Sequence, residues 1–577
     1  MSISSKEKDA LKNLQIEIGG NIPHVDELKS YTIGYQTKNN NVSGLCLFSC
    51  GLDTIPKEIE QLDQLETLYL RGNNVIDFSE ITCTLNLLKS IDISENRLHY
   101  IPDTIISLDA LEELHIETNN LKHLPENIGK LRNLEYLDIS GNKLTELPES
   151  ISNLDKLKFL DLSNNEINKL PRSIGALHSL QFLYLGNNNL RTLPESIGFL
   201  KSLKRLNIRK NLLNQLPKSF GSLTSLTSCF LKGNNLKTLP ESIGGLTSLK
   251  YLGINSNNLE AIPDSIGLLD KLENLSLGNN ELTSIPKTIG KLKSLLRFDI
   301  QNNGIKSLPA TLGELKLLNY FWANNNAIEV LPSSIGNLKY LSSLDLKQNQ
   351  LKELPESIGK LSSLFELDLY DNKLEHLPNS IGQLDNLEIL DLSSNKLLDL
   401  PETICQLKSL KELDLSTNKI RTIPHCIGKL FDLKNLILGF NKLKEIPESI
   451  GKLEELETLD LGKNLLKSVP DSIGNLAALK FLYLYYNNLK KMPDSINSLT
   501  ELEYINLSNN EIESLPESLE SLKKVEYFLI KSNKLTHLSE SVKEMEALKH
   551  LDVERNNIRE EPKFFSELRE QGVKIIK

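Results

Sequence analysis

Cysteine and histidine are the residues of this chain that could bind a metal ion or carry redox chemistry, and both are scattered. The six cysteines are Cys46, Cys50, Cys83, Cys229, Cys405 and Cys426. The nine histidines are His24, His99, His115, His123, His178, His376, His425, His537 and His550. No histidine stands at metal-ligand spacing from a cysteine or a carboxylate, and no nucleophile motif stands out. We therefore expect no enzyme activity, no metal and no cofactor, and we expect the thiols to be reduced.

Aromatic residues at a constant spacing of 23 suggest a different chemistry, the anchoring of a binding partner. They form two rows, with one isolated pair between them that includes the only tryptophan of the chain. These residues are Tyr136, Phe159, Phe182 and Tyr184, then Tyr320 and Trp322, and finally Phe481, Tyr483, Tyr485, Tyr504 and Tyr527. Exposed aromatic side chains are typical anchors of protein interfaces. Packing of these side chains against their neighbours along a sheet is the alternative interpretation.

Charged residues gather at the same spacing. A basic group consists of Arg205, Arg209, Lys210 and Lys232, and an acidic group of Asp345, Glu366, Asp368, Asp371, Asp391, Glu412 and Asp414. Like charges on adjacent strands repel each other, so such a group indicates either a docking site for an oppositely charged partner or a solvated surface. Both interpretations stay open at this point.

The element that must position all these residues is a ladder of asparagines. An asparagine stands at every 23rd residue from Asn73 to Asn556, which gives 22 asparagines on one register. One step before Asn73 the register falls on Cys50, where the flanking apolar spacing is unchanged. Each ladder residue closes the pattern L-x-x-L-x-L-x-x-N-x-L, as in the segment from Leu134 to Leu144. A constant short period of this kind predicts a solenoid.

One repeat consists of a short strand and a returning outer turn. In the repeat of Asn142, the segment Leu137-Asp-Ile139 alternates like a strand, and Pro148 begins the return as a short helix or 3-10 turn. Successive strands then lie parallel, about 4.8 Å apart. Residues six, four and two positions before each ladder asparagine face the concave side of this sheet. The aromatic and charged residues named above occupy these positions or lie beside them.

The outer segment Leu193-Pro-Glu-Ser-Ile-Gly-Phe-Leu200, with the asparagine pattern, resembles the intracellular leucine-rich-repeat proteins of the Ras-group and Shoc-like type, and the disease-resistance proteins. The resemblance covers residues 42–570 and implies an α/β solenoid of 23 repeats of 23 residues. It implies a leucine-rich-repeat horseshoe with a parallel concave β-sheet and short convex α/3-10 helices. It also implies a scaffold that binds proteins, often in small-GTPase signalling, so a Ras-like small GTPase is one expected partner.

Both ends of the array are predicted to carry caps, because an end repeat must shield one open core face. In residues 1–41, Ser4 and Glu7 have capping-box spacing, Gly19-Gly20 ends a helix, and a hairpin leads into the first repeat. Residues 571–577 are predicted to form a final capping strand. Cys46 and Cys50 are expected to point to different sides of the first repeat, and Cys405 and Cys426 occupy small-residue positions of the outer helices.

The composition limits which classes of partner and which cellular compartment we expect for this protein. The net charge is −10 with 25% charged residues, which gives no reason to expect nucleic acid. No apolar signal region and no run of membrane-spanning length stands out, which predicts a cytoplasmic protein without membrane insertion. The alternative function is recognition of a glycan or microbial ligand, because aromatic strips also stack on sugars.

Overall fold

The computed structural model describes residues 3–78 and 83–577, so the first two residues of the predicted 1–41 cap lie outside the described residues. The chain divides into two compact units, Met1–Leu282 and Thr283–Lys577. We describe each unit by itself.

The first unit begins with one α-helix and continues with short strands that alternate with 3-10 turns. The helix is α1 (Ser5–Glu17), and the strands are β1 (Gly34–Lys38), β2 (Asn41–Cys46), β3 (Thr67–Tyr69), β4 (Ser90–Asp92), β5 (Glu113–His115), β6 (Tyr136–Asp138), β7 (Phe159–Asp161), β8 (Phe182–Tyr184), β9 (Arg205–Asn207), β10 (Ser228–Phe230), β11 (Tyr251–Gly253) and β12 (Asn274–Ser276). The described 3-10 turns are η1 (Lys57–Gln61), η3 (Asp103–Ser107), η4 (Ile128–Lys130), η5 (Glu149–Asn153), η6 (Ile174–Ala176), η7 (Glu195–Phe199), η8 (Lys218–Ser222), η9 (Glu241–Gly245) and η10 (Asp264–Leu268).

The second unit has the same alternation and ends with a helix and a strand. Its strands are β13 (Arg297–Asp299), β14 (Tyr320–Trp322), β15 (Ser343–Asp345), β16 (Glu366–Asp368), β17 (Ile389–Asp391), β18 (Glu412–Asp414), β19 (Asn435–Ile437), β20 (Thr458–Asp460), β21 (Phe481–Tyr483), β22 (Tyr504–Asn506), β23 (Tyr527–Leu529), β24 (His550–Asp552) and β25 (Lys574–Ile576). Its helix is α2 (Phe564–Glu570), and its turns are η11 (Lys287–Lys291), η12 (Ala310–Glu314), η13 (Ser333–Asn337), η14 (Glu356–Lys360), η15 (Asn379–Gln383), η16 (Glu402–Gln406), η17 (Ile427–Lys429), η18 (Glu448–Lys452), η19 (Asp471–Asn475), η20 (Asp494–Ser498) and η21 (Glu540–Glu544).

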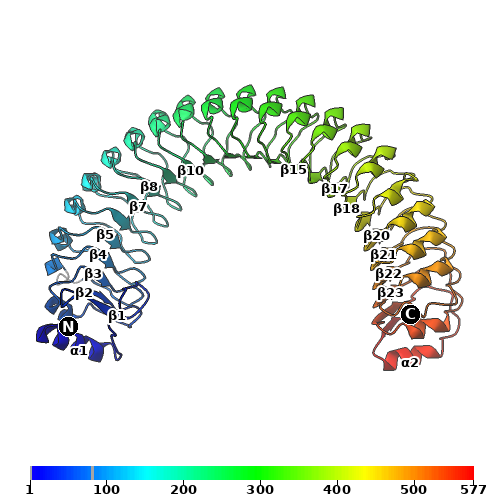
Figure 1. Ribbon diagram of the computed structural model, residues 1–577, viewed down its shortest axis with the longest axis horizontal. Coiled ribbons are helices and arrows are strands. Elements are labelled where there is room, and N and C mark those ends of the chain that lie inside the picture. Colours follow the sequence, from blue (N-terminus) through cyan, green and yellow to red (C-terminus); the bar gives the residue numbers. More distant parts are fainter. Residues whose placement is uncertain (1–2, 79–82) are drawn as a thin grey trace. The chain divides into compact units, whose positions relative to one another are not determined.

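Within each unit, the strands form a parallel sheet on the inner side and the 3-10 turns line the outer side (Figure 1). The register advances by one repeat per strand, so that Tyr136 lies beside Phe159 and Leu137 beside Leu160. The central residue of each strand from β3 to β24 is buried, and in most of these strands its two neighbours are half-buried on the open face. The parallel-sheet solenoid predicted from the ladder is therefore confirmed in both units.

Most ladder asparagines are buried, and they connect neighbouring repeats through the main chain. The Nδ2 group of Asn142 donates to the main-chain oxygen of Ile116 in the preceding repeat at 3.0 Å and to that of Ile139 at 3.1 Å. Its Oδ1 accepts from the main-chain N–H of Leu121 at 3.0 Å. Asn73 and Asn464 make the same set of bonds. The ladder therefore satisfies main-chain groups that the short strands leave unpaired.

Cys50 replaces the ladder asparagine in the first repeat, as its place in the register predicted. Its Sγ lies 3.6 Å from the main-chain oxygen of Phe48, within its own repeat. In the described residues this position follows α1 and the β1–β2 hairpin instead of another repeat, so the bonds that the asparagine amide makes to the preceding repeat have no counterpart here. The Cys50 thiol, which is a weak hydrogen-bond donor, is therefore sufficient at this ladder position.

A glycine on the outer side of most repeats lies in close contact with the next outer turn. A Cβ added at Gly359 would lie 2.2 Å from the main-chain oxygen of Ser380. After Gly129, Gly175 and Gly359, the following turns η5, η7 and η15 each have five residues. Where Ile106, Ser152 and Cys405 occupy the equivalent position, the following turns η4, η6 and η17 have three residues. A side chain at this position thus accompanies a shorter following turn in these three repeats, whereas Cys83 and Glu520 at the same position precede the five-residue turns η3 and η21.

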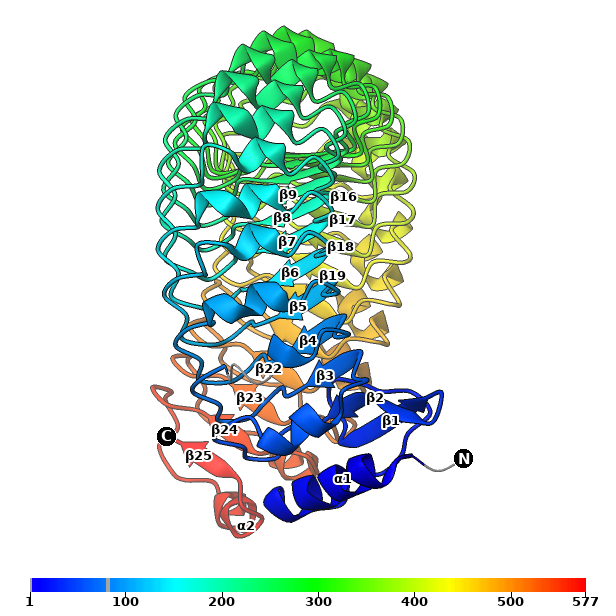
Figure 2. The same ribbon diagram turned by 90° about the vertical axis from the view of Figure 1, so that its left-hand side faces the viewer.

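The first unit begins with the helix and hairpin that the sequence suggested (Figure 2). The capping box is present, because Ser4 Oγ accepts from the Glu7 N–H and the Glu7 carboxylate accepts from the Ser4 N–H. The other carboxylate oxygen of Glu7 accepts from the Val42 N–H at 2.8 Å, which attaches α1 to β2. β1 and β2 pair antiparallel, a few residues from the expected bounds. At the end of the second unit, β25 extends the sheet beside β24.

Candidate partner-binding surfaces

The N-terminal aromatic stripe (Tyr136, Phe159, Phe182 and Tyr184) lies on the open face of β6, β7 and β8. All four side chains are half-buried. Tyr136 and Phe159 stack with ring centroids 4.2 Å apart and an interplanar angle of 5°. Phe159 also contacts Phe182 at 6.3 Å and Tyr184 at 5.4 Å. Packing between neighbours, the alternative interpretation, is therefore real, but it leaves part of every ring exposed.

The row of rings extends beyond the residues that the sequence singled out. His115 lies 4.6 Å from Tyr136 at one end. At the other end, the guanidinium of Arg205 lies 6.0 Å from the Tyr184 ring and 4.8 Å from the Phe230 ring, and Phe230 contacts Tyr251 at 4.8 Å. These three additional rings occupy the same concave positions, so the register alone could have found them.

The basic group lies beside this stripe in the first unit. Arg205, Arg209, Lys210 and Lys232 are all exposed, and none forms an ion pair with a carboxylate of the described residues. Arg209 lies over Gly186, where an added Cβ would come within 3.3 Å of its Cγ. The group therefore presents uncompensated positive charge next to aromatic surface.

Two further aromatic groups lie in the second unit. Tyr320 and Trp322 stack within β14 at 5.6 Å, and Arg297 lies 5.3 Å from the Tyr320 ring. In the C-terminal aromatic stripe (Phe481, Tyr483, Tyr485, Tyr504 and Tyr527), Tyr504 contacts Tyr483 at 5.1 Å and Tyr527 at 5.9 Å. Phe481 is half-buried beside Tyr504 in the sheet register. Burial raises the pKa of Tyr483, Tyr485 and Tyr504, so all three hydroxyls stay neutral at physiological pH.

The acidic group forms a column on adjacent strands of the second unit. Asp345, Asp368, Asp391 and Asp414 follow one another in the sheet register. One carboxylate oxygen of each accepts from the main-chain N–H two residues later, at 2.8 to 3.1 Å. Lys347 pairs with Asp345 at 3.4 Å and with Asp368 at 3.1 Å, which compensates only one end of the column. The local hydrogen bonds explain the aspartates structurally, and they leave the second carboxylate oxygens of Asp391 and Asp414 available to a partner.

Asp391 is expected to lower stability at neutral pH. Burial, and to a smaller extent the neighbouring Asp414 and Asp368, raise its pKa above the ordinary value. A carboxyl whose folded-state pKa is raised contributes stability below its unfolded pKa, and this contribution is lost as the pH rises through the folded pKa. Asp391→Asn keeps the acceptor oxygen for Ser393 and removes the charge. We expect a melting temperature about 1–3 °C higher at pH 7, since like charges on adjacent strands cost about 0.2–1 kcal/mol.

Calorimetry of the wild-type chain and the variant at several pH values checks this expectation. The gain of Asp391→Asn should shrink as the pH falls towards about 3, where the wild-type carboxyl is mostly protonated in both states. Asp385→Asn removes the same charge from an exposed outer position and serves as the control. A gain that grows as the pH falls would contradict the assignment.

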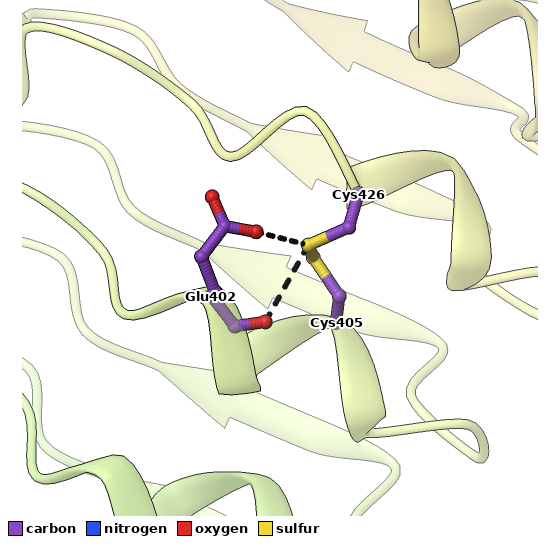
Figure 3. Close-up of a disulfide and its surroundings, with 3 residues drawn as sticks. All are labelled: Glu402, Cys405 and Cys426. Carbon is purple, nitrogen blue, oxygen red and sulfur yellow. Dashed lines mark hydrogen bonds between the residues drawn. A yellow bond between two sulfur atoms is a disulfide. The ribbon is translucent and has the colours of Figure 1, made fainter.

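Cys405 and Cys426 form a disulfide between two neighbouring outer turns of the second unit, with Cα atoms 5.8 Å apart (Figure 3). The expectation that all thiols are reduced is therefore wrong for this pair. Cys405 occupies the glycine position described above, and Cys426 occupies the serine position of the next repeat. Its Sγ lies 3.4 Å from the main-chain oxygen of Glu402. In another repeat, Ser219 at the equivalent position donates a hydrogen bond from its Oγ to the main-chain oxygen of Glu195, which the disulfide sulfur has no hydrogen to make. The repeat pattern did not reveal the pair, because the two cysteines are 21 residues apart and therefore do not occupy equivalent positions of the 23-residue repeat.

The same two sulfurs and the Glu402 carboxylate are donor atoms within 4.8 Å of one another. A metal ion requires thiolates, so the disulfide form offers only the carboxylate as a ligand. Of the remaining cysteines, Cys46, Cys83 and Cys229 are buried and Cys50 is half-buried. Burial raises the pKa of Cys46 to about 11 and that of Cys229 to about 12, which makes both thiols unreactive.

No helix in the described residues is long and apolar enough to cross a membrane. The model described as "Leucine-rich repeat region" matches residues 150–230, 424–509 and 471–571. The model described as "Leucine rich repeat" matches residues 63–121, 86–144, 110–167, 323–374 and 385–443, and a third, "Leucine Rich Repeat", matches residues 271–292. A comparison with curated protein sequences gave no match.

Solved structures of leucine-rich-repeat proteins are similar to this chain. A leucine-rich-repeat protein of Leptospira interrogans is 36% identical, covering 68% of this chain and 94% of its own, with a TM-score of 0.56. The plant peptide hormone receptor RGFR1, in complex with RGF2, is 30% identical over 92% of this chain and 94% of its own, with a TM-score of 0.68. The ectodomain of the Arabidopsis receptor kinase HAESA, in complex with an IDA peptide hormone, is 31% identical over 92% of each chain, with a TM-score of 0.61.

Proposed function

Because this chain belongs to the leucine-rich-repeat family, we propose that it is a non-catalytic scaffold that binds protein partners through the open face of the parallel strands in each unit. The observation that carries the proposal is the set of half-exposed aromatic rings on these faces. The rings stack on one another and stand on strands whose central residues are fully buried. They are therefore rigid before a partner arrives, and binding immobilises few free side chains.

The bound element that the geometry favours is an extended segment of a protein. The stripes follow the direction in which strands succeed one another, so a segment lying across them would meet one ring per repeat. The structures of RGFR1 and HAESA, each in complex with a peptide hormone, support this form of binding by analogy.

A Ras-like small GTPase is the partner class that the resemblance to Ras-group proteins favours, and we propose it together with a cytoplasmic signalling role. Purified Ras-like GTPases loaded with GDP or with a GTP analogue provide the direct test. Nucleotide-dependent affinity would support this partner class, and equal or absent binding in both states would exclude the GTPases tested.

The disulfide favours a second candidate, the recognition of a glycan or microbial ligand. Disulfides persist mainly in oxidising compartments, and exposed aromatic rows also stack on sugar rings. Alkylation of the cysteines in intact cells separates the two locations. Cytoplasmic protein should carry reduced Cys405 and Cys426, whereas exported protein should carry the bridge. A glycan array with the purified chain then tests the ligand directly.

The binding role itself is tested at the C-terminal aromatic stripe. Phe481→Ala, Tyr483→Ala and Tyr504→Ala are combined in the full chain, and partners are captured and quantified by mass spectrometry. We expect at least about a 30-fold loss of affinity for the captured partner, because truncation of one interface anchor costs about 2 kcal/mol or more. Tyr340→Ala with Phe431→Ala is the control, since both side chains are 60% exposed and lie outside the strands. Undiminished capture with an unchanged melting curve would remove this stripe from the proposal.

A further inference from the structure

The residue just before the ladder asparagine has a left-handed backbone in one repeat after another. In three successive repeats of the second unit this residue is Phe440, Lys463 and Tyr486, with φ of 59°, 53° and 54°. Their main-chain N–H groups donate to Gly462, Tyr485 and Ser508 in the next repeat at 2.7–2.8 Å. These bonds hold the backbone in this conformation whatever the side chain is.

Bulky aromatic residues are poorly suited to a left-handed backbone. The same position elsewhere holds residues that tolerate it well, such as Asn164, Asn187 and Asn279. Phe440 and Tyr486 are 45% and 53% exposed, so little burial of their rings offsets this strain. Strained residues that contribute little to the core are a reason to look for a function.

The three side chains form one cluster, which we call the edge cluster. The Lys463 Nζ lies 4.2 Å from the centroid of the Phe440 ring and 5.4 Å from that of Tyr486. No carboxylate of the described residues forms an ion pair with Lys463, although other exposed lysines of this unit, such as Lys434 and Lys549, have one. The cluster therefore presents a cation between two exposed rings.

The edge cluster is continuous with the C-terminal aromatic stripe. Tyr486 contacts Tyr485 of the stripe edge-to-face, with centroids 6.2 Å apart. The Tyr485 ring lies against Gly462, where an added Cβ would come within 2.3 Å of it. Glycine at this position thus lets the ring lie flat between the open face and the edge. A partner held on the stripe would reach the cluster without a gap.

We propose that the edge cluster is a docking site for a protein segment in which an acidic side chain is flanked by apolar side chains. The proposal rests on the protein-binding role proposed above and specifies the chemistry of the partner. The acidic group pairs with the Lys463 ammonium, and the apolar neighbours cover Phe440 and Tyr486. The alternation of ring, cation and ring along three repeats fixes this order of side chains in the partner.

A library of random peptides displayed on phage tests the proposal with the full chain as bait. We expect the wild-type chain to enrich peptides in which Asp or Glu stands between apolar residues. Peptides of this type should bind Lys463→Gln about tenfold more weakly, because the ion pair is lost. Lys442→Gln removes an exposed lysine two residues after Phe440 and should leave their binding unchanged.

Phe440→Asn with Tyr486→Asn provides a variant that cannot fail by unfolding. Asparagine tolerates the left-handed backbone, so this variant should melt at or above the wild-type temperature and still lose the enriched peptides. Enrichment without acidic residues, or equal binding of acidic peptides to Lys463→Gln, would overturn the proposal. Binding of an acidic oligosaccharide at the cluster with no peptide enriched would overturn it too. Loss of all enriched peptides in the stripe variant, with unchanged binding to Lys463→Gln, would preserve the proposed function and reject the edge cluster alone.

Discussion

Asn142→Leu is expected to lower the melting temperature of the first unit by roughly 10 °C. The asparagine is 7% exposed, and its amide connects Ile116 and Leu121 of the preceding repeat with Ile139 of its own. Leucine fits the apolar surroundings but can neither donate nor accept. Three buried main-chain groups then lose their partners, at about 1–3 kcal/mol each. A loss of roughly 3–9 kcal/mol moves the midpoint by about this amount in a unit of this size.

Scanning calorimetry on the full chain measures the effect, with Lys143→Leu as the matched control. Lys143 is the next residue along the chain and its side chain is exposed, so the control adds the same leucine without touching the ladder. A melting curve of Asn142→Leu that coincides with that of the control would contradict the structural role of the ladder.

The register of the ladder accounts for most of what could be predicted about the fold. The periodic leucines and asparagines predict the strand, the turn and the face of the sheet on which each side chain lies, because every repeat packs in the same way against its neighbours. The form of the outer turns could not be predicted this way. A three-residue turn follows Ile106 and Ser152, but a five-residue turn follows Cys83 at the same position, so the residue type alone does not decide the form of the next turn.

The candidate surfaces also differ in how far the sequence could predict them. The stripes at Tyr136 and Phe481 lie on the open faces because strand alternation is local and dependable. The edge cluster was missed because it requires knowledge of the backbone at Phe440 and Tyr486, which a pattern of residue types does not contain. An aromatic residue in a place where other repeats hold asparagine was nevertheless a visible signal.

The largest effect in the second unit is expected from the Cys405–Cys426 disulfide. It closes a loop with a sequence separation of 21 residues, and the chain-entropy model assigns about 3 kcal/mol to a loop of this length. A dithiol reductant should therefore lower the melting temperature of the wild-type chain by roughly 5–10 °C. Under denaturing conditions, alkylation should label four cysteines before reduction and all six after it.

Two double variants separate the covalent bond from the packing around it. Cys405→Ser with Cys426→Ser should melt like the reduced wild-type chain and ignore the reductant. Cys405→Gly with Cys426→Ser restores the residue types found in most repeats, so the next turn, η17, is free to take the five-residue form seen in η15. The melting temperature of this variant should also be unaffected by the reductant, but the variant should recover part of the lost stability, because the outer turns can then approach as closely as their neighbours do.

A wild-type melting curve that is identical with and without reductant would show that the disulfide contributes nothing to stability. Equal melting temperatures of the two double variants would show that glycine at position 405 gives no more stability than serine.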